Sequence, residues 1–212
     1  MPATMLSDPR RMTTHSTIKA EVAALKRDRI VAAAAQLFYE RGYERTTLEA
    51  VAESLGVTKP FIYSHFKSKA ELLADICTCG VSASLVAIFA ALALDARPTE
   101  KLRQLSRDFL LAVLGNQRNI AILTREEKNL EPADYQRLSA LRREFDQKLI
   151  SLLRAGVDAG EFSLADPAVA ALSIDGLVSW AYVWYRPHGR LSPEDLANEV
   201  SGLILSMVGV KQ

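Results

Sequence analysis

The chain has 212 residues, and its 26 Lys and Arg residues nearly balance its 25 Asp and Glu residues, giving a formal net charge of +1. This balance excludes a wholly basic, histone-like nucleic-acid binder but not a local basic patch. A hydrophobic fraction of 49% and a charged fraction of 24% are ordinary for a globular protein and exclude disorder over most of the chain. The length predicts one large domain or two small ones.

The cysteines and the most apolar segment predict an intracellular, non-membrane protein. Cys77 and Cys79 are too few and too close for a secreted disulfide framework, so we expect packing thiols in a reducing cytoplasm. The first 17 residues lack the apolar stretch of a signal peptide. No charge occurs between Asp75 and Asp95, but polar residues dilute this segment's first half. A buried helix therefore fits it better than a membrane span.

The pattern of the chain predicts an all-α fold of about nine helices. Residues 1–20 are polar and irregular, and we expect them to form a flexible arm. The first helix is predicted over residues 21–41, where apolar residues recur three and four positions apart, with Gly42 as its cap. Capping boxes, N-cap residues or first-turn prolines open most of the later helices. In chain order these start near Thr46, Thr58, Ser68, Thr99, Gln117, Pro132, Asp166 and Ser192.

The second and third predicted helices are joined by a tight turn, residues 54–58, which contains Gly56. This is the helix-turn-helix plan, in which the second helix can enter the major groove of DNA. From Ser54 to Ala70 there is no acidic residue, whereas lysines and hydroxyl groups are frequent. Phosphate oxygens bind such donors, and a carboxylate would repel them. We therefore expect a DNA-binding domain over residues 21–68, followed by a second domain over residues 69–212.

The run from Thr47 to Leu72 resembles the DNA-binding domain of TetR-family transcriptional repressors, and the similarity extends over about residues 25–76. It implies a ligand-responsive repressor that binds palindromic double-stranded operator DNA as a homodimer. It departs from the family at Pro60, which is more often Gly, and at Phe61, which is bulkier than the usual Thr or Ser. The resemblance implies base contacts by Thr58, Lys59, Pro60 and Ser64, and phosphate contacts by Thr47, Tyr63, His65, Lys67 and Lys69.

Each of these side chains also has a structural alternative. Tyr63 could be a half-buried core aromatic, and His65 a packing or capping group. Thr47 could cap the second helix, which is compatible with a phosphate contact. Lys67 and Lys69 could mark a solvated helix start.

The last two predicted helices, from Asp166 and Ser192, carry the candidate dimer face. Two helices from each subunit would form a four-helix interface, which a two-fold symmetric reader of DNA half-sites requires. An ordinary intramolecular core is the alternative. The apolar residues predicted for this face are Ala168, Val169, Leu172, Leu177, Trp180, Ala181, Leu196, Val200, Leu203, Ile204 and Met207.

The uncharged helix after Ser68 predicts a ligand pocket among the helices of the second domain. A ligand beside it would change the spacing of the two DNA-reading heads, a coupling of about 1–3 kcal/mol. Residues 180–194 resemble TetR-type repressors of fatty-acid, aromatic-acid and steroid degradation, which respond to acyl-coenzyme A thioesters. Ser179 departs from that group, which often has Asn there. The resemblance implies an apolar or acyl-CoA effector contacted by Trp180, Trp184 and Arg186, unless these residues only pack the helix junction or the dimer.

Nucleotide-binding, zinc-protease and nucleophile-elbow motifs are missing from the sequence, so we expect no catalytic residue, no metal site and no cofactor. Two alternatives stay open. A multidrug-type sensor of cationic compounds would need a carboxylate in the pocket, and none is evident in the uncharged helix. An all-α lipid carrier or enzyme would leave the acid-free segment 54–70 unexplained.

The near-neutral charge is an average of two unequal parts. Residues 1–72 hold 11 basic and 8 acidic residues, whereas residues 73–212 hold 15 and 17. The sequence therefore predicts a mildly basic DNA-reading head and a mildly acidic body.

Overall fold

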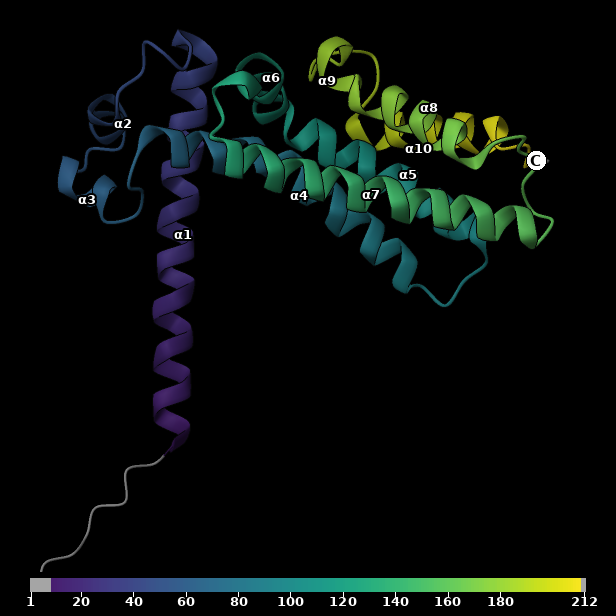
Figure 1. The fold of residues 1–212 in the computed structure, drawn as a ribbon, viewed down its shortest axis with the longest axis horizontal. Coiled ribbons are helices and arrows are strands. Elements are labelled where there is room, and N and C mark those ends of the chain that lie inside the picture. Colours follow the sequence, from purple (N-terminus) through teal and green to yellow (C-terminus); the bar gives the residue numbers. More distant parts are fainter. Residues whose placement is uncertain (1–8, 211–212) are drawn as a thin grey trace, which may run out of the picture. The chain divides into compact units, whose positions relative to one another are not determined.

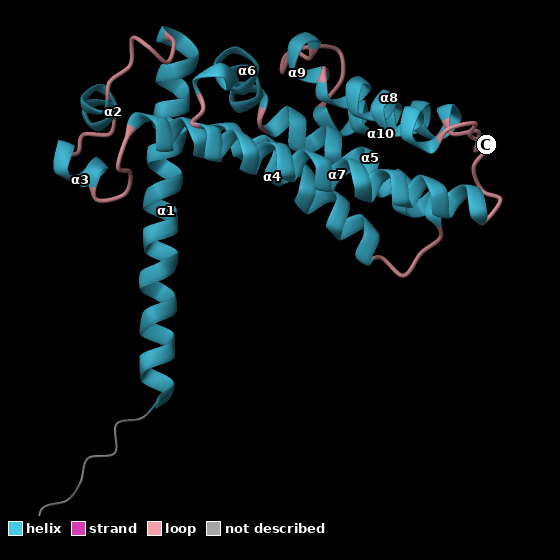
Figure 2. Cartoon of the chain, in the orientation of Figure 1, coloured by secondary structure: helices cyan, strands magenta, loops and turns pink. Residues whose placement is uncertain are grey.

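The computed structural model describes the backbone of residues 9–210 and the side chains of residues 20–210. All regular structure in the described range is helical, as Figure 2 shows, and the predicted all-α class is confirmed. The elements, labelled in Figure 1, are α1 (Pro9–Arg41), α2 (Leu48–Ser54), α3 (Lys59–Tyr63), α4 (Lys69–Ala93), α5 (Pro98–Gly115), α6 (Gln117–Glu126), the 3-10 helix η1 (Glu127–Asn129), α7 (Pro132–Asp158), α8 (Pro167–Ser179), α9 (Ala181–Trp184) and α10 (Pro193–Met207).

The nine predicted helices correspond to α1–α8 and α10, with two differences in their bounds. Helix α1 begins at Pro9, so helix replaces the predicted irregular arm over residues 9–20, whereas residues 1–8 of that arm lie outside the described residues. Proline at the first helical position loses no hydrogen bond, and no glycine follows before residue 42. The short α9 is new, because the helix that starts at Pro167 is interrupted at Trp180.

The chain divides into two compact units, residues 1–72 and 73–212. The boundary falls within the first turn of α4, slightly later than the predicted boundary after residue 68. Leu72 is completely buried, as are Phe66 and Ile62 of the same unit. Gly56 in the turn between α2 and α3 has a φ of +64°, a left-handed conformation that glycine adopts without the steric cost of a Cβ. We refer to residues 20–72 below as the head.

The second unit is organised around α5. Helix α10 packs along α5, and α7, α8 and α9 also contact it. The end of α7 depends on Gly156, because a Cβ at this position would lie 2.0 Å from the buried ring of Phe162. The glycine therefore lets the chain fold back directly over the helix.

Two helical segments have the length and composition of a membrane span, Lys69–Ala93 and Pro167–Trp184. Within α4, Leu85, Ile88 and Ala91 belong to the hydrophobic core of the second unit, which agrees with the prediction of a buried helix. The Pro167–Trp184 segment is far less buried, at 22% of its most apolar window. Most of its apolar residues therefore remain outside the core of the subunit.

Candidate nucleic-acid interface and ligand pocket

The local geometry of the head follows from its capping residues. Helix α2 is capped by Thr47, whose Oγ1 accepts a hydrogen bond of 3.2 Å from the backbone N–H of Ala50. This confirms the capping alternative for Thr47, whereas Thr46, where the helix was predicted to start, is completely buried and donates its hydroxyl to the Gly42 carbonyl at 2.9 Å. Thr58 is the N-cap residue of α3, but its side chain makes no capping bond. The exposed hydroxyl of Thr58 is therefore not used by the cap.

The predicted DNA contacts gather on the outward side of the head. Ile62 is completely buried and anchors α3, so that Tyr63 is 46% exposed, which argues against the core-aromatic alternative. His65 and Lys69 are more buried than Tyr63 and only partly exposed. The Ser64 hydroxyl donates to the Phe61 carbonyl at 2.7 Å and can still accept. The exposed candidates are Thr47, Thr58, Lys59, Pro60, Tyr63, Ser64 and Lys67.

Segment 54–70 contains no carboxylate, but a carboxylate from outside the segment lies close to it in the folded structure. Lys59 forms an ion pair with Glu49 of α2, and its ammonium lies 5.7 Å from the ring centroid of Tyr63. The hydrogen bond between the two side chains lowers the pKa of Glu49 and raises that of Lys59. Since both groups are solvent-exposed, this pair is weak and can exchange for a phosphate contact.

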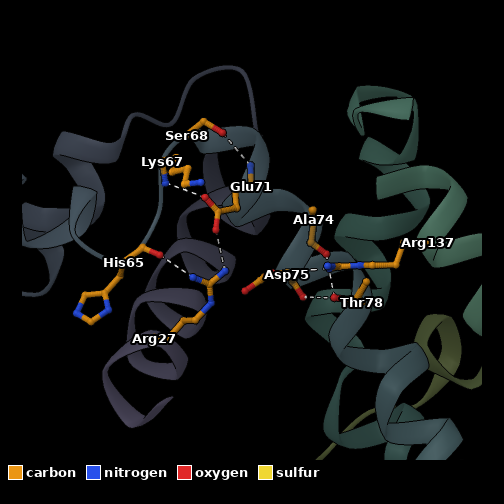
Figure 3. A network of polar contacts seen from close by, with 9 residues as sticks. All are labelled: Arg27, His65, Lys67, Ser68, Glu71, Ala74, Asp75, Thr78 and Arg137. Atoms are coloured by element: carbon orange, nitrogen blue, oxygen red, sulfur yellow. Dashed lines mark hydrogen bonds and ion pairs between the residues drawn. The ribbon is translucent and has the colours of Figure 1, made fainter. Parts of the chain in front are cut away.

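Arg27 of α1 ties the end of the reading region to the start of α4 (Figure 3). Its guanidinium donates to the His65 carbonyl at 2.6 Å and to the Glu71 carboxylate at 3.0 Å, and it covers the Phe66 ring with its centroid 4.0 Å away. Glu71 also accepts from the backbone N–H of Lys67 at 2.8 Å. That backbone bond first, and the Arg27 guanidinium after it, lower the pKa of Glu71. Sequence inspection missed Arg27 because it precedes the Thr47–Leu72 run in which the candidate DNA contacts lie.

The two lysines after α3 differ in their surroundings. The Nζ of Lys69 donates to the Tyr43 carbonyl at 3.0 Å and lies 4.2 Å from the centroid of the Tyr43 ring. The Lys67 side chain is exposed. Lys69 therefore holds the head together, while Lys67 presents its ammonium to solvent.

The second unit contains a cavity of about 360 Å³ among α4, α5, α6, α7 and α8. Trp180, a predicted ligand contact, lies on its wall, whereas Trp184 and Arg186 do not. Arg186 instead donates to the carbonyls of Val183 and Tyr185, and so closes the end of α9. The residues lining the cavity are Gly80, Val81, Ser84, Phe109, Val113, Ile120, Leu123, Thr124, Arg142, Phe145, Asp146, Asp175, Gly176, Ser179, Trp180 and Tyr182.

Two carboxylates line this cavity, Asp146 on α7 and Asp175 on α8. Burial raises the pKa of both groups, and at Asp175 the Ser179 hydroxyl, which donates at 3.1 Å, partly opposes the shift. The cation Arg142 on the same wall donates to Glu127 at 2.5 Å. The pocket carboxylate sought in the uncharged helix is thus absent from α4 but present on two helices packed around it.

The predicted dimer residues separate into a buried and an exposed set, apart from Ala168, which is partly buried. Ala181, Leu196, Val200 and Ile204 are buried within the subunit, so for these four residues the intramolecular-core alternative holds. The exposed set lies on α8, on its C-cap residue Trp180 and on α10, and both helices pack against α5. This exposed apolar face consists of Val169, Leu172, Leu177, Trp180, Leu203 and Met207.

The cysteines and the ion pair between Arg137 and Asp75 have structural roles. Cys77 is buried, which raises its pKa to about 12, and the Cys79 thiol donates to the Asp75 carbonyl at 3.2 Å. Among the described residues, no three His, Cys, Asp or Glu side chains lie in a group that could hold a metal ion. Arg137 lies 3.9 Å from Asp75, which joins α7 to α4 within the second unit (Figure 3).

Each of the two units matches a known protein family. Residues 30–76 match the family model of bacterial regulatory proteins of the tetR family, and residues 95–208 match the tetracyclin repressor-like C-terminal domain. The chain belongs to the TetR family of transcriptional regulators. This confirms the family resemblance seen in the sequence.

Individual relatives cover most of the chain. The TetR-family transcriptional regulator PfmR from Thermus thermophilus is 31% identical with a TM-score of 0.77, over 86% of this chain and 99% of that one. The transcriptional repressor KstR2 from Rhodococcus jostii is 29% identical over 85% of this chain and 89% of its own length. AibR, solved with isovaleryl coenzyme A and operator DNA, is 28% identical with a TM-score of 0.72, over 84% and 97%.

Proposed function

We propose that this protein is a dimeric repressor that binds palindromic operator DNA and is released from it by a small apolar effector, in particular an acyl-CoA thioester. The observation that carries the proposal is that one helix, α4, belongs to both functional parts. Its first turn lies in the head, and its residues Gly80, Val81 and Ser84 line the cavity. A ligand in the cavity can therefore act on the helix that enters the head.

The head supplies two kinds of DNA contact in this proposal. Thr58, Lys59, Pro60 and Ser64 at the start of α3 meet base edges in the major groove. Thr47, Tyr63, His65, Lys67 and Lys69 bind phosphates and set the register. The ion pair of Lys59 with Glu49 opens on binding, since a phosphate is an equivalent partner for an exposed ammonium.

The exposed apolar face on α8 and α10 supplies the dimer contact. Large side chains that would otherwise lie in water, such as Leu172 and Leu203, are buried when a second copy covers this face. The same face explains the apolar Pro167–Trp184 segment without a membrane. Two copies then present two heads to the two half-sites of an operator.

The effector proposal rests on the cavity and on two relatives. A cavity of about 360 Å³ suits one compact apolar group, so the acyl part enters and the coenzyme A part stays outside. AibR has been solved with isovaleryl coenzyme A, and KstR2 of Mycobacterium tuberculosis is described as a ketosteroid transcriptional regulator. We place the protein in the cytoplasm, where operator DNA and such thioesters are found, and we assign it no catalytic role.

Titration of an operator complex tests this proposal. Protein bound to its operator is titrated with medium- and long-chain acyl-CoAs, free fatty acids and cationic dyes, and the released DNA is measured by fluorescence anisotropy. Release by a thioester at micromolar concentration, and not by coenzyme A alone, supports it. Release by cationic dyes alone would instead identify a sensor of cationic compounds. If the protein binds no specific DNA sequence, the result would support the alternative of an all-α lipid carrier.

A further inference from the structure

The wall of the cavity in the second unit is largely apolar, and its charged residues are Arg142, Asp146 and Asp175. Four aromatic rings line it, those of Phe109, Phe145, Trp180 and Tyr182. Asp146 and Asp175 interrupt this apolar surface. The pKa of each of these carboxyl groups is raised by burial, which means that their charged forms are poorly solvated there.

The charges of this acidic pair are incompletely compensated by the protein. Arg142, which also lines the cavity, attracts both carboxylates and so partly opposes the rise of their pKa, while its guanidinium donates to Glu127 at 2.5 Å. Among the described side chains, the Ser179 hydroxyl donates to Asp175, and no hydrogen bond to Asp146 is found. The remaining acceptor positions of both carboxyl groups can therefore be filled only by water or by an occupant of the cavity.

A purely hydrocarbon occupant would displace that water and leave both carboxyl groups without donors. An unpaired buried polar group is unfavourable, and an unpaired buried charge more so. An occupant that brings its own donor avoids this penalty, and one that brings a positive charge also gains from the surrounding aromatic faces.

We propose that Asp146 and Asp175 form the selectivity point of this cavity, which favours an apolar molecule carrying a hydrogen-bond-donating group, most strongly a protonated amine and next a hydroxyl group. The inference rests on the proposed function only in treating the cavity as the effector site. If the effector is an acyl-CoA thioester, the inference predicts that its hydrogen-bond-donating group lies at the buried end of the acyl group.

Three probes of one shape test this directly: 2-phenylethylammonium, 2-phenylethanol and ethylbenzene. Binding to the full-length protein is measured by isothermal titration calorimetry and by thermal shift, without coenzyme A and without DNA. We expect the amine to bind about tenfold or more tightly than ethylbenzene, with the alcohol in between, as a hydrogen bond to a charged group requires.

Asp146→Asn and Asp175→Asn keep the shape of the wall and remove its charge. Each variant should reduce the preference for the amine to about threefold or less, and the double variant should abolish it. Glu144→Gln is the matched control, because Glu144 is an exposed carboxylate on the same helix as Asp146 and lies outside the cavity lining. This control should keep the full preference.

Equal binding of ethylbenzene and the amine to the unmodified protein would overturn the inference, whatever the variants do. Retention of the amine preference in the double Asn variant would overturn it as well, because the charge would then act elsewhere. The thioester titration is a separate measurement: its failure, with the amine preference intact, would reject the thioester effector and leave the selectivity point standing.

Discussion

The head and the second unit build their functional surfaces in opposite ways. In the head, all nine candidate DNA contacts lie between Thr47 and Lys69, and seven of them are exposed. In the second unit, the cavity wall collects residues from Gly80 to Tyr182. The first surface is a continuous piece of chain presented to solvent, whereas the second exists only after several helices have packed.

This difference has a physical cause. A helix-turn-helix reads DNA with the outward side of two short consecutive helices, so its chemistry is local in the chain. A cavity is the space that packed helices leave unfilled, and its lining depends on which side of each helix faces inward. Substitutions in each unit can therefore test whether its function and stability depend on neighbouring residues of the chain or on contacts between distant residues.

Breaking the exposed apolar face should have the largest effect. Leu172 and Leu203 are 67% and 60% exposed, so Leu172→Asp together with Leu203→Asp should leave the subunit folded but monomeric. Operator affinity should fall roughly 10²-fold or more, because the second head is no longer tethered to the first. Sedimentation and DNA-binding titration measure the two effects.

The control for this experiment is Val86→Asp. Val86 is 70% exposed but lies on α4, outside α8 and α10. It should leave both dimerisation and operator affinity unchanged. A double variant that still sediments as a dimer would show that the exposed apolar face is not the interface.

Gly156→Ala tests a distant contact in the second unit. Its Cβ would overlap the ring of Phe162, 2.0 Å away, so the free energy of unfolding should fall by about 1–3 kcal/mol. Gly115→Ala at the end of α5 is the comparison, since nothing lies within 4 Å of a Cβ there. It should be neutral or stabilising by up to about 1 kcal/mol. Equal effects in urea unfolding would contradict the argument.

Variants of Lys67 and Lys69 test which of the two lysines contacts DNA and which one stabilises the head. Lys67→Ala should reduce the salt dependence of operator binding by about one unit of slope, as the loss of one phosphate contact requires. Lys69→Ala should change this slope less and lower the melting temperature more, because Lys69 donates to the Tyr43 carbonyl. An unchanged slope for Lys67→Ala would remove Lys67 from the phosphate contacts.

The smallest expected effect concerns pH. The pKa of Glu71 is lowered below its ordinary value of 4.5, so the stability that its carboxylate contributes is complete above pH 4.5 and is lost as the pH falls through the lower folded pKa. Glu71→Gln should remove this dependence, a change under about 1 kcal/mol because the side chain is partly solvent-exposed. Melting curves between about pH 3 and 7 measure it, with the exposed Glu53→Gln as a control. Identical curves for the protein and Glu71→Gln would contradict the prediction.

The fold was predictable where helix signals are local. Asp166 caps α8, accepting from the N–H of Ala168 at 2.8 Å, and Ser192 caps α10, accepting from the N–H of Asp195 at 3.1 Å, both as predicted. The predictions were less accurate where neighbouring residues compete for one role. Thr47 caps α2 in place of Thr46 because burial and the Gly42 carbonyl occupy the Thr46 hydroxyl.

The candidate sites were predictable to different degrees. The head candidates came from one acid-free run, yet Glu49 reaches Lys59 and Arg27 reaches the His65 carbonyl from outside it. Trp180 lines the cavity as predicted, but Asp146 and Asp175 carry no local signal, since a lone aspartate on a helix reads as a solvated residue.

The sequence alone determined the class of the protein, its succession of helices and the short segment that meets DNA, because capping and helix periodicity act within a few residues. Tertiary structure decided what that near-neutral sequence could not: where the opposite charges meet. It pairs Glu49 with Lys59 and Arg27 with Glu71, and it places Asp146 and Asp175 together in the wall of a largely apolar cavity. Electrostatic and packing energies depend on distances in space, and residues far apart in the chain acquire those distances only when it folds.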